Sequence, residues 1–244
     1  MGVDNSTVDP NGEIRLKHYG RRRGKGFSKR KHFLLSEILP RMAPKGVSNE
    51  ENPFRKKIKF AEVFGRDCPV WVEVGFGGGE HLIHLARKYS NVGFIGCEPY
   101  ENGVAKIVQS IFDKKISNVK VIMNDVRNFF SVTPDASVAK VFLLFPDPWP
   151  KKKHIKRRFI DDQNLESLRR ILQPGGKFYL ATDSNDYVRH SIAKIMCNND
   201  FEWLANSRKD WVEPWDDWID TRYFKKARRS GKVCTFLVFQ RKNI

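Results

Sequence analysis

Between residues 70 and 197, short apolar and β-branched runs alternate with amphipathic stretches, and this alternation restricts the folds open to the chain. The runs carry apolar side chains on both faces, which is typical of strands buried within a parallel sheet. Strict alternation of strands and helices favours an α/β fold in which helices cover both faces of such a sheet. The expected strands are 70–74, 92–97, 119–123, 138–145 and 177–182, and the expected helices are 80–89, 101–112, 158–172 and 185–197.

Two further patterns place the end of this region. The sequence Pro-Gly-Gly at 174–176 predicts a turn between a helix and the next strand. The last apolar run, 233–240, has no helix after it. We therefore expect this run to join the sheet as an antiparallel edge with the segment near 201–204.

Two helices are expected before the sheet, within residues 33–66. Apolar residues from Phe33 to Met42 keep helical spacing. Asn52 and Pro53 suit the cap and the first position of a second helix, which is expected to end at Phe64.

The first 32 residues differ in composition from the rest of the chain. Residues 15–31 contain nine Lys or Arg and no acid, so residues 1–32 are expected to form a basic, disordered arm. The remaining length, 33–244, is sufficient for one hydrophobic core. We therefore expect a single domain over 33–244.

The chain carries 45 Lys or Arg against 28 Asp or Glu, which gives a formal net charge of +17. An imbalance of this size favours a polyanionic partner, with nucleic acid ahead of an anionic membrane. No apolar run approaches the roughly 20 residues of a membrane-spanning helix, and the N-terminus lacks the apolar core of a signal peptide. We therefore expect a cytoplasmic protein that binds nucleic acid and no membrane.

The four cysteines, Cys68, Cys97, Cys197 and Cys234, are scattered along the chain without a C-x-x-C spacing. This distribution predicts neither a zinc site nor a disulfide framework. We expect no bound metal.

A glycine-rich turn follows the first predicted strand, in the sequence VEVGFGGGEH. Gly75, Gly77 and Gly79 would let the backbone approach a ligand closely at the junction of strand and helix. The dinucleotide pattern G-x-G-x-x-G fails, because its third glycine would fall on Glu80. The pattern G-x-G-x-G after Glu73 is that of S-adenosylmethionine sites. That ligand carries an ammonium and a sulfonium, which favour nearby carboxylates, and it has no pyrophosphate.

Acidic residues end the next two predicted strands. Glu98 lies 23 residues after Gly75, where an acid can accept hydrogen bonds from both ribose hydroxyls. Asp125 ends the third strand, beside the expected position of the adenine. With Glu73, these acids stand at three successive strand ends, which converge on one crevice of a parallel sheet. Taken alone, Asp125 is better explained as a helix cap, and glycine turns after strands are common.

The fourth predicted strand leads into Asp147, which lies between Pro146 and Pro148. The prolines fix φ on both sides, so the carboxylate is held in place before a substrate arrives. Methyl transfer needs such rigidity, because the nucleophile must lie in line with the sulfonium carbon at contact distance. Trp149 offers a plane on which a displaced base can stack. The alternative is a proline-rich turn with a core tryptophan.

Six Lys or Arg residues fall between Lys151 and Arg158, directly after that aspartate. A track of this length can bind successive phosphates, whereas a small anionic substrate would not need it. A second cluster, 222–232, has six Lys or Arg in eleven residues, and the N-terminal arm supplies a third. Charge runs are usually only solvated faces. Three of them, one beside the expected catalytic loop, favour a nucleic-acid surface.

Together these motifs resemble the tRNA (guanine-N7-)-methyltransferases of the bacterial single-chain type. The resemblance spans roughly residues 54–240 and rests on VEVGFGGGEH, GCEPY, NDV, FPDPWPKKKH, ATD at 181–183 and T-R-Y at 221–223. It implies an α/β, Rossmann-like class I methyltransferase fold with a mostly parallel seven-stranded sheet, an antiparallel last strand and helices on both faces. It also implies S-adenosylmethionine as the methyl donor and the variable-loop guanine of tRNA, position 46, as the acceptor.

The resemblance also assigns roles to individual positions. It implies cofactor contacts from the glycine turn and the four acids, namely Glu73, Gly75, Gly77, Gly79, Glu98, Asp125 and Asp147. Asp147 would also stand at the reaction centre. Substrate contacts are implied for Lys151, Asp183, Thr221, Arg222, Tyr223 and Phe224. RNA contacts are implied for the basic run Lys152, Lys153, His154, Lys156, Arg157 and Arg158. No obligate protein partner is implied, and the choice between monomer and homodimer stays open.

One position departs from the family, because Phe224 stands where glutamate usually follows T-x-Y. Phenylalanine cannot accept hydrogen bonds from the N1 and amino groups of guanine. Asp183 or a backbone carbonyl is therefore the expected acceptor for that edge. Guanine N7 carries a lone pair and no proton, so methylation there needs no strong general base, and no His or Cys stands out as one. Asp147 and Asp183 could stabilise the positive charge that develops on the purine.

Other functions remain open from the sequence. The loop D-P-W resembles the D-P-P-Y loop of enzymes that methylate exocyclic nitrogens, so the acceptor could be another nucleic-acid nitrogen. A cofactor-free RNA-binding protein on a decayed methyltransferase fold is a second alternative, which Phe224 favours. A nicotinamide oxidoreductase is disfavoured by the missing third glycine.

Overall fold

The computed structural model describes residues 6–8, 14–16, 19–20, 22–24, 26, 28–197 and 199–243. A seven-stranded sheet has the order β5-β4-β3-β6-β7-β9-β8, and β1 pairs only with β2. The strands are β1 (Ser6–Val8), β2 (Ile14–Leu16), β3 (Val70–Val74), β4 (Gly93–Cys97), β5 (Val119–Ile122), β6 (Val138–Leu144), β7 (Leu172–Thr182), β8 (Phe201–Trp203) and β9 (Thr235–Arg241). Much of the arm expected at 1–32 lies outside the described residues, so its predicted disorder stays a prediction.

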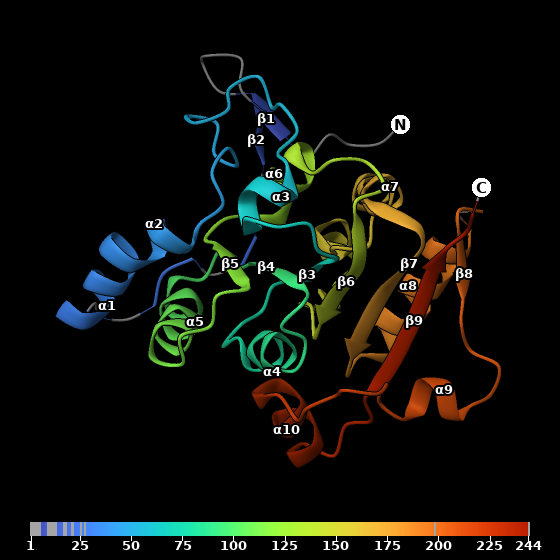
Figure 1. The fold of residues 1–244 in the computed structure, drawn as a ribbon. Helices are drawn as coiled ribbons and strands as arrows, with labels where there is room; N and C mark the ends of the chain where they lie inside the picture. Colours follow the sequence, from blue (N-terminus) through green and yellow to red (C-terminus); the bar gives the residue numbers. More distant parts are fainter. Residues whose placement is uncertain are drawn as a thin grey trace.

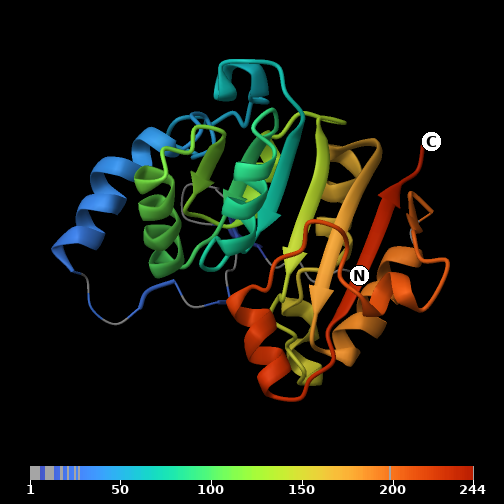
Figure 2. The same cartoon turned by 60° about the horizontal axis from the view of Figure 1, so that its bottom comes forward.

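The five strands from β5 to β7 are parallel, and β9 is antiparallel to both of its neighbours. Figure 2 shows the arrow of β9 running against those of β6 and β7. From β3 the chain moves outward through β4 to β5, and then returns to the other side of β3 with β6. A reversal of this kind leaves a crevice at the carboxyl ends of the two central strands. The predicted fold class is confirmed.

Helices cover both faces of the sheet (Figure 1). The α-helices are α1 (Lys29–Phe33), α2 (Leu39–Met42), α3 (Phe60–Phe64), α4 (Glu80–Lys88), α5 (Glu101–Asp113), α6 (Val126–Val132), α7 (Asp162–Ile171), α8 (Asn185–Met196), α9 (Lys209–Val212) and α10 (Arg222–Arg229). A π-helical turn, Leu34–Ile38, joins α1 to α2, and a 3₁₀ helix covers Lys152–Arg157. No helix in the described part of the chain is long and apolar enough to cross a membrane.

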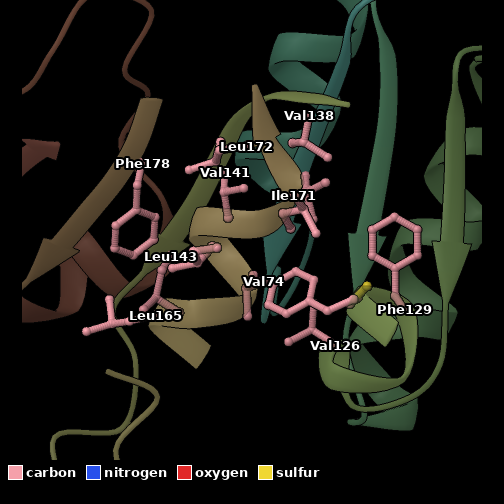
Figure 3. Close-up of a cluster of buried hydrophobic side chains, with 14 of the residues drawn as sticks. Val74, Val126, Phe129, Val138, Val141, Leu143, Leu165, Ile171, Leu172 and Phe178 are labelled. Atoms are coloured by element: carbon pink, nitrogen blue, oxygen red, sulfur yellow. The ribbon is translucent and has the colours of Figure 1, made fainter. Parts of the chain in front are cut away.

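Each face of the sheet has its own core. On one face, side chains such as Val74, Val141 and Phe178 pack against α6, α7 and α8 (Figure 3). On the opposite face, Phe94 and Phe142 pack with α4, α5 and the segment that joins α1 to α2. Because successive side chains of a strand point to opposite faces, apolar residues at every position are consistent with helices on both sides.

The first helical segment begins earlier than predicted. The side chain of Ser28 accepts a hydrogen bond from the amide of Lys31 and caps α1, which starts at Lys29 rather than at Phe33. Ser is among the preferred cap residues. The segment ends at Met42 as expected.

The helix predicted to start at Asn52 and Pro53 is wrong, because α3 covers only Phe60–Phe64. The side chain of Asn52 instead closes a loop, donating to the carbonyls of Gly46 at 2.9 Å and Lys56 at 2.7 Å. It also accepts from the amide of Lys56 at 2.9 Å. Asparagine serves loop backbones as well as helix ends, so the local pattern did not separate the two roles.

Pro174 and Gly175 do not form the predicted turn between a helix and a strand. Helix α7 ends at Ile171, and β7 begins at the next residue and continues through this sequence. The register of β7 against β6 shifts between Val138 and Lys140, and Gly175 has a φ of +76°. The sequence therefore forms an irregularity within the strand, where glycine can take the left-handed conformation.

Three other expectations need correction. The last strand, β9, is antiparallel as predicted, but it lies between β7 and β8, so β8 forms the edge. Helix α7 starts at Asp162 and not at Arg158, because the side chain of Asp161 caps it. Helices α6 and α10 were not predicted as helices, although Asp125 was recognised as a possible cap for the first of them.

Asn118 links α4 to the start of β4 and β5. The nitrogen of its buried side-chain amide lies 3.0 Å from each of the carbonyl oxygens of Ala86, Tyr89 and Val92, which share its two hydrogens. An Asn118→Ala substitution would leave these carbonyls without that donor, so we expect unfolding free energy to fall by about 2–3 kcal/mol. Urea denaturation measures the change. Asn91→Ala, at an exposed neighbouring position, should change stability by less than about 0.5 kcal/mol. Equal stability of the two variants would contradict this role.

Candidate active site

A cavity of about 570 Å³ lies at the carboxyl ends of β3, β4 and β6, which is the crevice expected from the strand order. Its volume is within the usual range of small-molecule sites. The structure brings ten of the predicted site residues to its wall, namely Gly75, Gly77, Glu98, Asp125, Asp147, Lys156, Arg157, Arg158, Arg222 and Tyr223.

The glycine turn bends the backbone between β3 and α4 in a way that few other residues tolerate. Gly75, Gly77 and Gly79 have φ values of +68°, +55° and +76°. A Cβ on Gly103, in α5, would lie 2.2 Å from the carbonyl oxygen of Gly77. Glycine at these positions therefore allows both the left-handed turn and a direct backbone contact between the turn and α5.

Glu98 joins the glycine turn to the end of β4. One of its carboxylate oxygens accepts from the amide of Gly77 at 2.8 Å, and the other accepts from the amide of Tyr100 at 2.9 Å. The side chain is 8% exposed and lines the cavity. Each carboxylate oxygen can accept more than one hydrogen bond. Glu98 can therefore hold the turn and still accept from ligand hydroxyl groups.

Asp125 serves both as a helix cap and as part of the cavity wall. Its side chain accepts from the amide of Arg127 at 3.0 Å and so caps α6. The same carboxylate also binds the guanidinium of Arg127 at 2.8 and 2.9 Å. Burial lowers the pKa of Arg127, but the hydrogen bond and charge of Asp125 outweigh it, so the pKa is raised. The helix cap is therefore confirmed and does not exclude Asp125 from the cavity wall, whereas its contact with a cofactor stays a prediction.

Asp161 and Asn164 also line the cavity, although no motif in the sequence pointed to either residue. Asp161 caps α7 by accepting from the amide of Asn164 at 2.8 Å, and burial raises the pKa of its carboxyl. The side-chain oxygen of Asn164 is buried without a hydrogen-bond partner among the described residues. A buried acceptor of this kind is available to a ligand that donates a hydrogen bond.

The loop that carries Asp147 is held in an unusual backbone conformation. Phe145 and Trp149, which flank the Pro-Asp-Pro sequence, have φ values of +51° and +41°. Such values cost a non-glycine residue roughly 1–3 kcal/mol each and persist where the surrounding structure fixes them. The amide of Phe145 donates to the carbonyl of Ala181 at 2.7 Å, which fixes the start of the loop to β7. Asp147 is exposed at the cavity wall.

Aromatic and cationic side chains lie beside this loop. The guanidinium carbon of Arg157 is 4.9 Å from the ring centre of Trp149 and 4.8 Å from that of Tyr19. The two rings meet edge to face at 6.4 Å. Tyr19 and Gly20 line the cavity although they belong to the expected N-terminal arm. The sequence showed the basic character of that arm but not its contact with the cavity.

Several predicted site residues lie outside the cavity wall. Glu73 is buried and its carboxylate bonds the Nδ1 of His81 at 2.8 Å, on the face of the sheet that α4 covers. Asp183 forms an ion pair with Lys232 at 2.7 Å. Thr221 caps α10. The remaining ones are Gly79 at the start of α4, the exposed residues Lys151, Lys152 and Lys153, and His154, whose ring meets that of Trp149 edge to face.

Phe224 belongs to the hydrophobic core and not to the cavity. It is 7% exposed, and its ring centre lies 5.4 Å from that of Trp218 and 6.1 Å from that of Phe236. The neighbouring Tyr223, by contrast, lines the cavity. A substrate contact from the side chain of Phe224, as expected from its position in the motif, is therefore wrong for this structure. The residue instead attaches α10 to the end of the sheet.

A family model described as "Putative methyltransferase" matches residues 67–237. A tRNA (guanine-N(7)-)-methyltransferase of Paracoccus denitrificans (strain Pd 1222) is 43% identical over 98% of this chain and 100% of its own length. Another of the same name, from Jannaschia sp. (strain CCS1), is 45% identical over 93% of this chain and 94% of its own length. The chain belongs to the tRNA (guanine-N7-)-methyltransferase family.

Solved structures with low sequence identity share the fold of this family member. The 16S rRNA methyltransferase KamB superposes with a TM-score of 0.56 and 14% identity, covering 75% of this chain and 92% of KamB. An antibiotic-related methyltransferase superposes with a TM-score of 0.52 and 17% identity, covering 77% of this chain and 97% of its own. These likenesses support the methyltransferase fold. Among the described residues, no cluster of three or more His, Cys, Asp or Glu could hold a metal ion.

The backbone contact at Gly103 can be tested by adding a single methyl group. Gly→Ala within a helix usually stabilises by roughly 0.5–1 kcal/mol. Gly103→Ala should instead destabilise by about 1–3 kcal/mol, because the new Cβ overlaps the carbonyl of Gly77. Thermal denaturation shows whether the substitution raises or lowers the stability. Gly78→Ala is the control, since its Cβ would meet only the flexible ends of Glu80 and Lys106. A stabilised Gly103→Ala would contradict the contact.

Proposed function

We propose that this protein transfers a methyl group from S-adenosylmethionine to N7 of the variable-loop guanine of tRNA, position 46. The observation that carries the proposal is the position of Asp147. Its strained loop stands at a cavity that also contains the glycine turn, Glu98 and Asp125, and cationic side chains border the same cavity. The names of the curated relatives support the reaction and the RNA class. We place this activity in the cytoplasm and in a single domain over 33–244.

The cavity residues suit the proposed cofactor. Gly75 and Gly77, both with positive φ, bring backbone without a side chain of its own to the cavity, and the ring of Tyr223 lies beside Gly77. Glu98 can accept hydrogen bonds from ribose hydroxyls, and Asp125 and the buried oxygen of Asn164 can accept from the adenosine or the amino acid part. Bound there, S-adenosylmethionine would supply an electrophilic methyl group. Glu73 does not line the cavity, so its role would be indirect. Its bond to His81 attaches α4, the helix that follows the glycine turn, to β3.

The protein has little proton chemistry to perform in this reaction. Guanine N7 uses a lone pair, so no general base has to remove a proton. Asp147 would orient the purine and stabilise the positive charge that develops on it. Cys97 also lines the cavity, but burial raises its pKa well above the ordinary value and keeps it a neutral thiol. A covalent route through that cysteine is therefore disfavoured.

The basic residues provide a surface for the RNA backbone. Lys151, Lys152 and Lys153 are exposed, and they directly follow the loop of Asp147. Lys156, Arg157 and Arg222 reach the cavity wall, where they could bind phosphates next to the target guanine. Because Phe224 is buried, we assign recognition of the guanine N1 and amino groups to Asp183 or to a backbone carbonyl.

The decisive experiment uses unmodified tRNA and S-adenosylmethionine labelled in its methyl group. Mass spectrometry of the digested RNA should find the label in 7-methylguanosine. A tRNA with adenine in place of the variable-loop guanine should stay unlabelled. Label in another nucleoside would favour a different acceptor nitrogen. Tight tRNA binding without any binding of the cofactor would favour the decayed, non-catalytic alternative.

Asp147→Ala should lower the rate of methyl transfer at saturating substrates by about 10²–10³-fold, because a charge that stabilises the transition state is lost. The affinity for tRNA should stay within about twofold, since removal of an acid beside phosphates does not weaken their binding. Single-turnover rates and filter binding measure the two quantities. Asp162→Ala, which removes an exposed acid outside the cavity wall, is the control. Equal losses of rate and affinity would contradict the assignment.

Binding of tRNA should weaken with salt, with a slope of log K against log salt of about 0.7–0.9 per neutralised phosphate. Replacing both Lys152 and Lys153 by Ala should reduce that slope by roughly 1.5, if each lysine binds one phosphate. Lys59→Ala, directly before α3 and paired with Glu62, should leave the slope unchanged. A flat salt dependence of the unsubstituted protein would contradict the proposed RNA surface.

A further inference from the structure

Arg158 is predicted from the sequence to bind RNA, but the structure turns its side chain into the protein. The residue is 3% exposed, although the four lysines of the same run are exposed. Its Nε donates to the carbonyl of Pro148 at 2.9 Å, and one terminal nitrogen donates to the carbonyl of Trp149 at 3.4 Å. That terminal nitrogen also pairs with the carboxylate of Asp186. A buried guanidinium with these partners is not available to phosphates.

The partners of Arg158 lie on two elements that carry site residues. Pro148 and Trp149 directly follow Asp147, whereas Asp186 lies in the first turn of α8, just after β7. The guanidinium carbon also lies 5.6 Å from the ring centre of Tyr187, which is fully buried. Arg158 therefore connects the loop of Asp147 to the start of α8, in addition to the bond between Phe145 and β7.

The loop needs such an attachment because its backbone is strained. Phe145 and Trp149 both have positive φ, and a conformation of this kind persists only where its surroundings fix it. Proline has no amide hydrogen, so Pro146, Pro148 and Pro150 cannot donate backbone hydrogen bonds that would fix the loop. Its carbonyl groups remain, and Arg158 binds two of them. The planar fork of arginine can bind two carbonyls and a carboxylate in one plane, which a lysine ammonium cannot reproduce.

We propose that Arg158 is a positioning residue, which holds the backbone of the Asp147 loop in the geometry of methyl transfer, and that Asp186 orients Arg158. The proposal rests on the proposed function. Both arginines line the cavity, but their partners differ, because the guanidinium of Arg157 lies against the rings of Tyr19 and Trp149. Two adjacent arginines thus have separate tasks, one toward the backbone of the loop and one toward the ligand side.

The first test is Arg158→Lys, which keeps the charge and removes the planar fork. The rate of methyl transfer at saturating tRNA and cofactor should fall by about 10²-fold, because small misplacements of reacting groups cost that much. The dissociation constants of tRNA and S-adenosylmethionine should stay within about threefold. Arg169→Lys on α7 is the matched control: its side chain pairs with Glu166 at the surface, and all three quantities should stay unchanged. A raised tRNA dissociation constant with an unchanged saturated rate would overturn the proposal, because that result is expected of a phosphate contact.

Asp186→Asn tests whether Asp186 orients Arg158, and it does so without altering a buried residue. It should lower the saturated rate by about 3–10-fold, and it should add almost nothing to Arg158→Lys in the double variant. Fully additive effects of the two substitutions would overturn the coupling. Because Asp186 is half exposed, this variant also serves if Arg158→Lys does not fold.

A readout that needs no catalysis separates this proposal from the proposed function. Hydrogen exchange measured by mass spectrometry on the peptide covering 143–151 should be faster in Arg158→Lys than in the unsubstituted protein. It should be unchanged in Arg169→Lys. If the unsubstituted protein does not methylate tRNA but the exchange result holds, the proposed function fails and the attachment of the loop stands. Unchanged exchange in Arg158→Lys would overturn the attachment.

Discussion

The backbone contact between Gly77 and Gly103 is the constraint on which the rest of the site depends. A single Cβ at Gly103 would come within 2.2 Å of the carbonyl of Gly77, so turn and helix meet with no side chain between them. The same turn donates its amide to Glu98, the acid that ends β4. These two contacts together fix the end of β3, the end of β4 and the start of α5 relative to each other. Asp125 and Asp147 complete the wall from β5 and β6.

The strained loop of Asp147 differs from the glycine turn because residues outside the loop hold its conformation. The glycine turn adopts positive φ at little cost, since glycine has no Cβ. Phe145 and Trp149 adopt it at a cost, which bonds to Ala181 and Arg158 must offset. Leu143, in β6 directly before the loop, belongs to the buried core shown in Figure 3. The loop is therefore attached to a stable sheet, and this attachment fixes the position of the exposed carboxylate of Asp147.

Features that depend on local pattern were predictable from the sequence, and features that depend on tertiary partners were not. The strand 70–74 matched because a strand buried on both faces has apolar residues at every position. The glycine turn and Glu98 were found because a close backbone approach needs particular residues at fixed spacing. The helix predicted to start at Asn52 was wrong because the amide of asparagine can bond the backbone of a loop as well as that of a helix end.

In the basic run 151–158 and the segment 221–224, the sequence pattern did not indicate which side chains are buried. In the sequence Arg158 is one cation among six, and only its burial against two carbonyls and Asp186 distinguishes it. Phe224 directly follows the exposed residues Arg222 and Tyr223, yet it packs in a core of aromatic rings contributed by distant parts of the chain. Tyr19 reached the cavity from the N-terminal arm. Sequence spacing carries no information on which of several similar side chains turns inward.

The dense positive charge beside Asp147 does not neutralise it. None of the ion pairs in the described part of the chain involves Asp147, although six Lys or Arg follow within eleven residues. Arg158 is bound to carbonyls and to Asp186, and Arg157 lies against two aromatic rings. A guanidinium paired with Asp147 would cancel the field that a purine feels as it becomes positively charged. Because Arg157 and Arg158 have other partners, the carboxylate of Asp147 remains exposed at the cavity wall, next in sequence to the exposed side chains of Lys151, Lys152 and Lys153.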